Sequence, residues 1–182
     1  MPEKLVFENA IEGLFVRGLG NKVTPGLRAE LVTLGIDLSK KLPPAVSREA
    51  WYKALAAAAR HCYPSLEREA ALRAVGVVLM KGVEETFFGR AMAPMVRLLG
   101  TRRLLERVPK NMKSSNNFAD GVVTPLAERR LQLDATDCGD APEVFQGSLE
   151  EMARWAGAKD VKVTLQVQTP PAARFIIEWG GE

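Results

Sequence analysis

Residues 76–117 read GVVLMKGVEETFFGRAMAPMVRLLGTRRLLERVPKNMKSSNN, and this stretch decides the fold. Its first part is almost uncharged, which predicts a central helix over residues 75–88 that is buried on all sides. Pro94 is expected to kink or break this helix, because proline removes a backbone hydrogen bond. A short basic helix is then predicted over residues 101–109, with a threonine at its start as the cap.

The chain before this stretch has the three- and four-residue apolar spacing of further helices. Two of their starts are marked by capping residues, Thr24 followed by Pro25, and Ser47. The expected helices cover residues 8–19, 24–34 and 47–63, and a longer helix capped by Ser65 leads into the central one.

The last third of the chain changes to the two-residue period of strands. Residues 161–168, VKVTLQVQ, alternate apolar and polar side chains, which predicts a sheet with one buried and one wet face. Helices followed by strands predict an α+β fold: an N-terminal helical layer packed on a C-terminal antiparallel sheet with one inserted helix. We expect a single domain, 1–182, mainly helical over 1–118 and strand-rich over 119–182. The other expected elements are strands at 121–123, 129–133 and 174–179 and the inserted helix at 143–156.

The composition is that of a soluble globular protein, with 182 residues of which 47% are apolar and 26% charged. The net charge is only +3 and the basic residues are spread along the chain, which makes nucleic acid an unlikely partner. No apolar run approaches the roughly 20 residues of a membrane-spanning helix. The N-terminus does not resemble a signal peptide, and Cys62 and Cys138 are expected as free thiols, so the expected location is cytoplasmic.

Five segments resemble a large paralogous family of uncharacterised proteins from myxobacteria. They are VFENAIEGLFVRGLG (6–20), LGIDLSKKLPPAVSREAWYKALAAAARHCYP (34–64), EAALRAVGVVLMKGVEETFFGRAM (69–92), RLLGTRRLLERVPKNMKSSNNF (97–118) and FQGSLEEMARWAGAKDVKVTLQV (145–167). That resemblance implies no activity, cofactor or catalytic residue. The C-terminal part, a helix followed by a two-strand ribbon, is also similar to the tail of vinyl-reductase-like and haem-nitric-oxide-binding sensor domains. This second resemblance implies a sensor-like fold.

His61 is the only histidine and is expected near the end of a helix. It is a candidate haem or metal ligand, but a helix C-terminus also favours a histidine through the helix dipole, and we favour that structural role. One histidine and two distant cysteines cannot supply the four ligands of a zinc site. We therefore expect no metal and no cofactor, and the absence of a convergent set of reactive side chains leaves no catalytic residue to assign.

Between residues 97 and 113, six basic residues stand against one acidic residue. Guanidinium groups beside short polar side chains suit anionic ligands, although the same residues also suit a solvated face. The aromatic residues at 87 and 88 either fill the core or line a ligand cavity. The candidate ligand or partner contacts are Phe87, Phe88, Arg90, Arg103, Arg107, Lys110, Asn116 and Asn117.

These observations favour a non-enzymatic binding or signalling module. The first hypothesis is a cytoplasmic regulatory or sensor-like domain that binds an apolar or anionic small molecule beside the central helix. The alternative is a protein-protein interaction scaffold, with a possible homodimer, that docks partners through its basic helix or a sheet edge. An enzyme is the third hypothesis. A cavity lined by residues 87–90 would favour the sensor, and a closed core would favour the scaffold.

Overall fold

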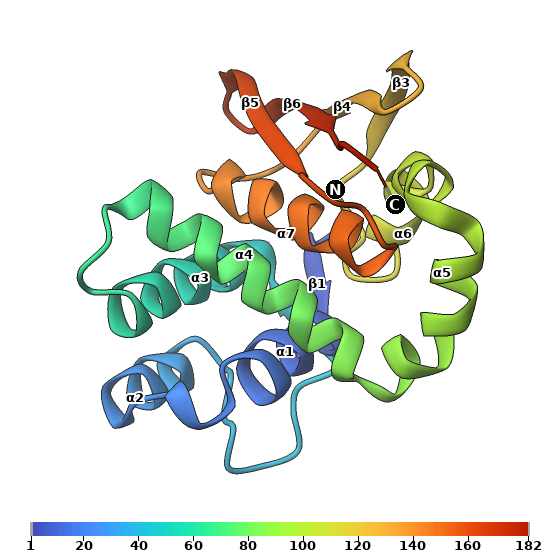
Figure 1. Ribbon diagram of the computed structural model, residues 1–182. Coiled ribbons are helices and arrows are strands. Elements are labelled where there is room, and N and C mark those ends of the chain that lie inside the picture. The colour runs from blue at the N-terminus through green and yellow to red at the C-terminus, as the bar shows by residue number, and fades with distance from the viewer. Residues whose placement is uncertain (1, 182) are drawn as a thin grey trace.

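The computed structural model describes residues 2–181 and confirms the expected α+β fold (Figure 1). Helices make up most of the chain as far as α6, and the last third forms the main sheet with one helix between its strands. The elements in chain order are β1 (Leu5–Phe7), α1 (Glu8–Ile11), the π-helical η1 (Glu12–Gly18), the 3₁₀ turn η2 (Gly20–Lys22), α2 (Pro25–Thr33), β2 (Ala45–Ser47), α3 (Arg48–Cys62), α4 (Arg68–Glu85), α5 (Phe87–Glu106), α6 (Val108–Met112), β3 (Gly121–Ala127), β4 (Arg130–Ala135), α7 (Pro142–Trp155), β5 (Lys162–Thr169) and β6 (Ala172–Glu178).

The main sheet is antiparallel and has the strand order β3-β4-β6-β5. Leu133 of β4 and Leu165 of β5 both lie opposite Phe175 of β6, so the apolar residues of three strands meet on one face. Helix α7 covers this face, and the ring of Phe145 stacks on that of Phe175 with 6.4 Å between centroids. The strands predicted from the alternating pattern are therefore confirmed, with ends that differ by a few residues.

A second, two-stranded sheet ties the N-terminus to the middle of the chain. In this sheet β1 pairs with β2, and Val6 lies opposite Val46. The strand at 5–7 follows the short apolar run there, whereas the strand at 45–47 was not predicted, and Ser47 was expected only as a helix cap. Phe7 N also donates a hydrogen bond of 2.8 Å to Ser115 O, so residues more than a hundred positions apart lie side by side.

Helices α4 and α7 cross at very short range because each helix places a glycine against the backbone of the other helix. A Cβ atom at Gly76 would overlap the carbonyl oxygen of Val144, and one at Gly147 would overlap the carbonyl oxygen of Arg73. Ser148 Oγ donates a 3.1 Å hydrogen bond to Gly76 O across the same contact. Since α7 also packs on the sheet, it forms the layer between the sheet and the N-terminal helices (Figure 1).

The predicted central helix is correct in place but wrong in its end and in its complete burial. Helix α4 ends at Glu85, and Thr86 starts α5 by accepting a 3.1 Å hydrogen bond from Gly89 N on its hydroxyl. Val75 is fully buried, but Lys81 is exposed, because the close glycine contacts cover only parts of the helix.

The predicted break at Pro94 is also wrong, since this residue lies inside α5. The non-helical residue is Gly100, whose φ of 73° is in the left-handed region that glycine adopts without strain. The basic helix predicted at 101–109 is confirmed at its start, because helical geometry resumes directly after Gly100, but it ends at Glu106, and Pro109 lies in the first turn of α6.

The predicted caps Thr24 and Ser47 are confirmed. Their hydroxyls accept hydrogen bonds from Leu27 N and Ala50 N, at 3.1 and 3.2 Å. The predicted cap Ser65 is wrong, because α4 begins at Arg68 and Glu67 is its N-terminal flanking residue without a side-chain cap.

Candidate ligand site

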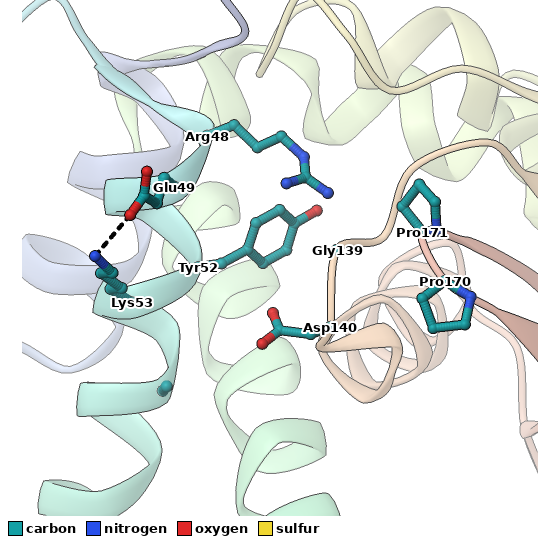
Figure 2. A pocket seen from close by; sticks show the side chains of 9 residues that line it. Arg48, Glu49, Tyr52, Lys53, Gly139, Asp140, Pro170 and Pro171 are labelled. Atoms are coloured by element: carbon teal, nitrogen blue, oxygen red, sulfur yellow. Dashed lines mark hydrogen bonds and ion pairs between the residues drawn. The ribbon is translucent and has the colours of Figure 1, made fainter.

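A hollow of about 540 Å³ lies where α3, the loop before α7 and the β5–β6 turn meet. Its walls therefore come from both the helical part and the sheet part of the chain. Figure 2 shows the Arg48 guanidinium and the Tyr52 hydroxyl pointing from α3 towards the loop at Gly139, with Pro170 and Pro171 on the far side. The lining residues are Arg48, Glu49, Tyr52, Lys53, Ala56, Gly139, Asp140, Pro170 and Pro171.

Arg48 is held in place by its backbone and by its side chain. It is the first residue of α3, and its N–H donates a 2.8 Å hydrogen bond to Lys4 O at the edge of the small sheet. Its guanidinium donates from Nε and Nη2 to both carboxylate oxygens of Asp137, at 2.7 to 3.0 Å. The guanidinium carbon also lies 5.0 Å from the ring centroid of Tyr52. This anchoring fixes the orientation of the cation at the hollow.

Asp137 is the buried partner that organises this cluster, with 3% of its surface exposed. It also accepts hydrogen bonds from Lys4 Nζ at 2.9 Å and from Gly139 N at 3.1 Å. Burial alone would raise the pKa of Asp137, but the hydrogen bonds from Arg48, Lys4 and Gly139 outweigh it and hold the pKa below its ordinary value. The carboxylate therefore stays ionised and continues to hold Arg48.

The floor of the hollow is built by Tyr52 and the loop that packs on it. Burial, helped by Cys138 and Asp137, raises the pKa of Tyr52 well above its ordinary value, so its hydroxyl remains a hydrogen-bond donor. Gly139 has a φ of 60°, and a Cβ atom there would overlap the Tyr52 ring. The loop is positioned by a 2.7 Å hydrogen bond from Cys138 N to Pro171 O. Burial raises the pKa of the Cys138 thiol to about 12, so this thiol is neutral.

The hollow offers both donors and acceptors to an occupant. Arg48 Nη1 and the Tyr52 hydroxyl make no hydrogen bond with the described residues, and both are available to an acceptor oxygen. Glu49 is paired with Lys53 at 2.7 Å, while the exposed Asp140 adds an acceptor on the opposite rim (Figure 2). Such a combination suits a small polar molecule, with apolar contact supplied by Ala56 and the two prolines.

The contact residues predicted from the sequence lie elsewhere, and the structure does not bring them together at this hollow. Phe87 is 89% exposed and Phe88 62% exposed at the start of α5, so the interpretation that they fill the core is wrong. Arg90 is exposed beside them and its Nε lies 3.6 Å from Glu85 Oε2. Arg103, Arg107 and Lys110 are exposed on the end of α5 and on α6. Their roles as contacts stay predictions.

Asn116 and Asn117 use their side chains to hold the backbone. Asn116 Oδ1 accepts hydrogen bonds from Phe118 N and Ala119 N at 3.1 and 2.7 Å. Asn117 Oδ1 accepts a 2.8 Å hydrogen bond from Leu5 N, which joins the turn to β1. The Asn116 side chain thus holds the turn itself, and the Asn117 side chain fixes the contact between the turn and the N-terminal strand.

His61 lies at the far end of α3 from the hollow, about 20 Å along the helix axis from Arg48. Its Nε2 is 3.2 Å from Glu30 Oε2, and its ring faces Gly26, so the imidazole is held between α2 and α3. Within residues 2–181 no group of three or more histidine, cysteine, aspartate or glutamate side chains has the arrangement of a metal site.

Sequence reasoning missed every residue that lines this hollow. Arg48 and Tyr52 are four positions apart, so their shared helix face was readable from the sequence. No local signal connects them to Asp137, Gly139 or the Pro170–Pro171 turn, which lie about ninety or more residues further along the chain.

The fold and the family follow from comparison with known proteins. Residues 4–180 match the family described as protein of unknown function (DUF2378), so the chain belongs to that family. A comparison with curated proteins returned no match.

Among solved structures, the chain is similar to H-NOX domains over nearly its whole length. An H-NOX protein from S. oneidensis is 12% identical, with 96% of this chain and 94% of that chain covered at a TM-score of 0.68. A structure from work on haem redox potential and porphyrin distortion is 13% identical, with 95% and 98% covered at 0.65. An oxygen-binding H-NOX domain related to soluble guanylate cyclases is 14% identical, with 94% and 91% covered at 0.58. At these identities the likeness shows the fold alone, and the fold resemblance expected for the C-terminal part extends over almost the whole chain.

The hollow and the His61–Cys62 pair do not fit a haem. Haem iron in proteins is held by histidine, cysteine, methionine or tyrosine. His61 lies between α2 and α3 against Gly26 and does not line the hollow, and burial raises the pKa of the neighbouring Cys62, which disfavours a thiolate ligand. Tyr52 lines the hollow, but its raised pKa disfavours a phenolate ligand. We therefore assign no haem chemistry to these residues.

Proposed function

We propose that this chain is a sensor-like regulatory domain that works without haem. It binds a small polar molecule in the hollow between α3 and the β5–β6 turn and does not convert it chemically. The observation that carries the proposal is the position of the hollow. Its walls come from α3, from the loop before α7 and from the sheet turn, so an occupant contacts both parts of the fold at once. A ligand that binds one relative arrangement of these parts more tightly shifts the population towards it.

Two further observations support this function. The H-NOX likeness supplies the architecture of a sensor domain, and the ligand groups at the hollow belong to a fixed cluster. Because Arg48 bridges the hollow and the buried Asp137, an occupant that hydrogen-bonds Arg48 acts on the contact between β1, α3 and the loop before α7. We place this activity in the cytoplasm, where the free thiols Cys62 and Cys138 fit a reducing setting.

The test is native mass spectrometry of the protein purified from cells, with Ala56→Trp as the variant that fills the hollow. Ala56 is only partly buried, so the indole is accommodated by occupying the hollow rather than the core. The wild type should carry a small-molecule adduct that is lost in Ala56→Trp and retained in Ala56→Ser. Two negative results together would remove the basis of this proposal. They are a wild type without adduct and Tyr52 NMR signals that stay unshifted when a fragment library of small carboxylates and amides is added.

An interaction scaffold is the second candidate, and the edge of the main sheet favours it. Strand β3 lies at one edge in the sheet order, and its residues Val122 and Leu126 are 64% and 46% exposed. Exposed apolar side chains on an edge strand suit pairing with a strand of another chain, including a second copy. Size-exclusion chromatography with light scattering tests this: Val122→Lys should dissociate an assembly made through β3, and a monomeric wild type argues against a homodimer.

A further inference from the structure

Helix α5 presents large apolar side chains to solvent. Phe87 and Leu98 are 89% and 87% exposed, and Phe88 and Met95 are 62% and 44% exposed. Fully exposed phenylalanine and leucine side chains that lie close together mark interaction sites more often than ordinary surface. Together with the intervening arginines they form the α5 outer surface, made of Phe87, Phe88, Arg90, Met95, Arg97 and Leu98.

These residues lie on one side of the helix. Positions 87, 91, 95 and 98 follow the three- and four-residue spacing of a single helical face, and all four are exposed. The opposite side carries Gly89 and Val96, which are buried against the body of the protein. Figure 1 shows α5 at the outer edge of the molecule, and the exposed fractions of its side chains place this face in solvent.

The net positive charge of the chain is concentrated at this surface and its continuation. Residues 85–113 contain seven basic and two acidic side chains, whereas the rest of the chain contains eighteen basic and twenty acidic ones. Arg97, Arg103 and Arg107 are exposed and form no ion pair with the described residues. Apolar protrusions and unpaired cations thus occur together on one helix.

The charge pattern selects the occupant. A second copy of the chain would bring the same positive charges face to face, which opposes association. In a groove of a protein partner, Arg97 would be buried among apolar side chains and would need a carboxylate of the partner, since an unpaired buried charge is costly. At an anionic lipid surface, long arginine side chains reach the phosphates while neighbouring apolar side chains enter the layer beneath.

We propose that the α5 outer surface binds an anionic membrane surface. Phe87, Phe88 and Leu98 enter the boundary between headgroups and acyl chains, and Arg90 and Arg97 contact lipid phosphates. Arg103, Arg107 and Lys110 add long-range attraction to the same negative surface. This goes beyond the proposed ligand site, which uses none of these residues, so either proposal can fail without the other.

Vesicle co-sedimentation tests the proposal. The probes are phosphatidylcholine vesicles and vesicles with about 30% phosphatidylglycerol, a composition that gives an anionic surface. The wild type should sediment with the anionic vesicles and not with the neutral ones, and added salt should weaken binding because it screens the charges. Arg97→Glu with Arg103→Glu should lower the partition coefficient at least about tenfold. Phe87→Ser with Leu98→Ser should lower it by about tenfold or more.

Matched controls separate a specific surface from general basicity. Arg28→Glu with Lys41→Glu makes the same charge change at exposed positions of α2 and the following loop, and Val32→Ser with Leu66→Ser removes apolar groups that are 49% and 45% exposed. Both controls should bind within about threefold of the wild type. Equal losses in controls and α5 variants would overturn the proposal. So would a wild type that ignores anionic vesicles but binds polyglutamate through Arg97 and Arg103, which would reassign the surface to an acidic protein.

Discussion

Gly147→Ala is expected to destabilise the protein, although alanine is the better helix former. The added Cβ would overlap the carbonyl oxygen of Arg73 and lie 2.9 Å from Val77 N, both backbone atoms of α4 that cannot rotate away. The two helices must therefore separate by about 1 Å or more, which weakens close contacts along the whole crossing.

The size of the effect follows from three contributions. The gain in helix propensity is about 1 kcal/mol, and the forced separation of two packed helices costs about 3 kcal/mol. Separation also weakens the paired hydrogen bonds of Arg73 with Glu150 at 3.1 and 2.5 Å and the bond from Ser148 Oγ to Gly76 O, at about 1 kcal/mol more. The net loss is about 3 kcal/mol, which lowers the melting temperature by about 6–12 °C in a chain of this size.

Thermal and urea unfolding followed by circular dichroism measure this loss, with Gly26→Ala as the control. Gly26 is an exposed residue of α2 whose Cβ would lie 3.0 Å from His61 Cε1, and a shift of the His61 side chain by a few tenths of an ångström relieves this contact, so the control should melt within about 2 °C of the wild type. A Gly147→Ala protein that melts at or above the wild-type temperature would show that the α4–α7 contact is not as close as described.

Three other outcomes test the electrostatic and cofactor assignments. Asp137→Ala should cost about 2 kcal/mol in urea unfolding at neutral pH, because it leaves the half-buried Arg48 unpaired. The pKa of Asp137 is held low, so the stabilisation that its carboxylate provides is present above about pH 4. The difference in unfolding free energy between wild type and variant should therefore shrink as the pH falls through that pKa. For Glu84 the sign is reversed: burial and the nearby Glu151 raise its pKa to about 7, so its ionisation destabilises the fold as pH rises from about 4.5 through 7. Glu84→Gln should therefore raise the melting temperature at pH 8 by about 2–4 °C, for a discounted gain of about 1 kcal/mol, and leave it unchanged at pH 4. Incubation with hemin and desalting should leave no Soret band, and a stable band that disappears in His61→Ala would contradict the poor fit of these side chains to haem.

The sequence predicted the elements better than their contacts, and the reason is physical. The strand predicted from alternation in residues 161–168 and the caps predicted at Thr24 and Ser47 depend on local signals, and the structure confirms this strand and both caps. The end of the central helix was predicted wrongly because, judged from the sequence alone, Pro94 disfavours a helix more strongly than Thr86 does. In the structure the chain bends at Thr86, whose hydroxyl donates a hydrogen bond to Val83 O and accepts one from Gly89 N.

The candidate site could not be predicted because it depends on tertiary convergence. Arg48 and Asp137 are 89 positions apart, and only the folded chain brings their charges within 3 Å. The exposure of Phe87 was equally hidden, since an apolar run predicts burial unless the path of the helix is known. The local pattern thus specified most elements, while the ligand-facing side chains depended on which elements pack together.

The contacts that join β1 to the middle of the chain also set the order in which the fold can form during synthesis. Lys4 and its partner Asp137 are separated by 133 positions. At about 5–20 residues per second, a ribosome needs about 7–27 s to make that length of chain. Within that interval β1 can pair with β2 only after residue 47 has been made, and the other edge of β1 then stays unpaired until residues 115–117 follow. An open strand edge in an unfinished chain is a place where chaperones and other nascent chains bind, so β1 stays accessible to them until the middle of the chain has been made.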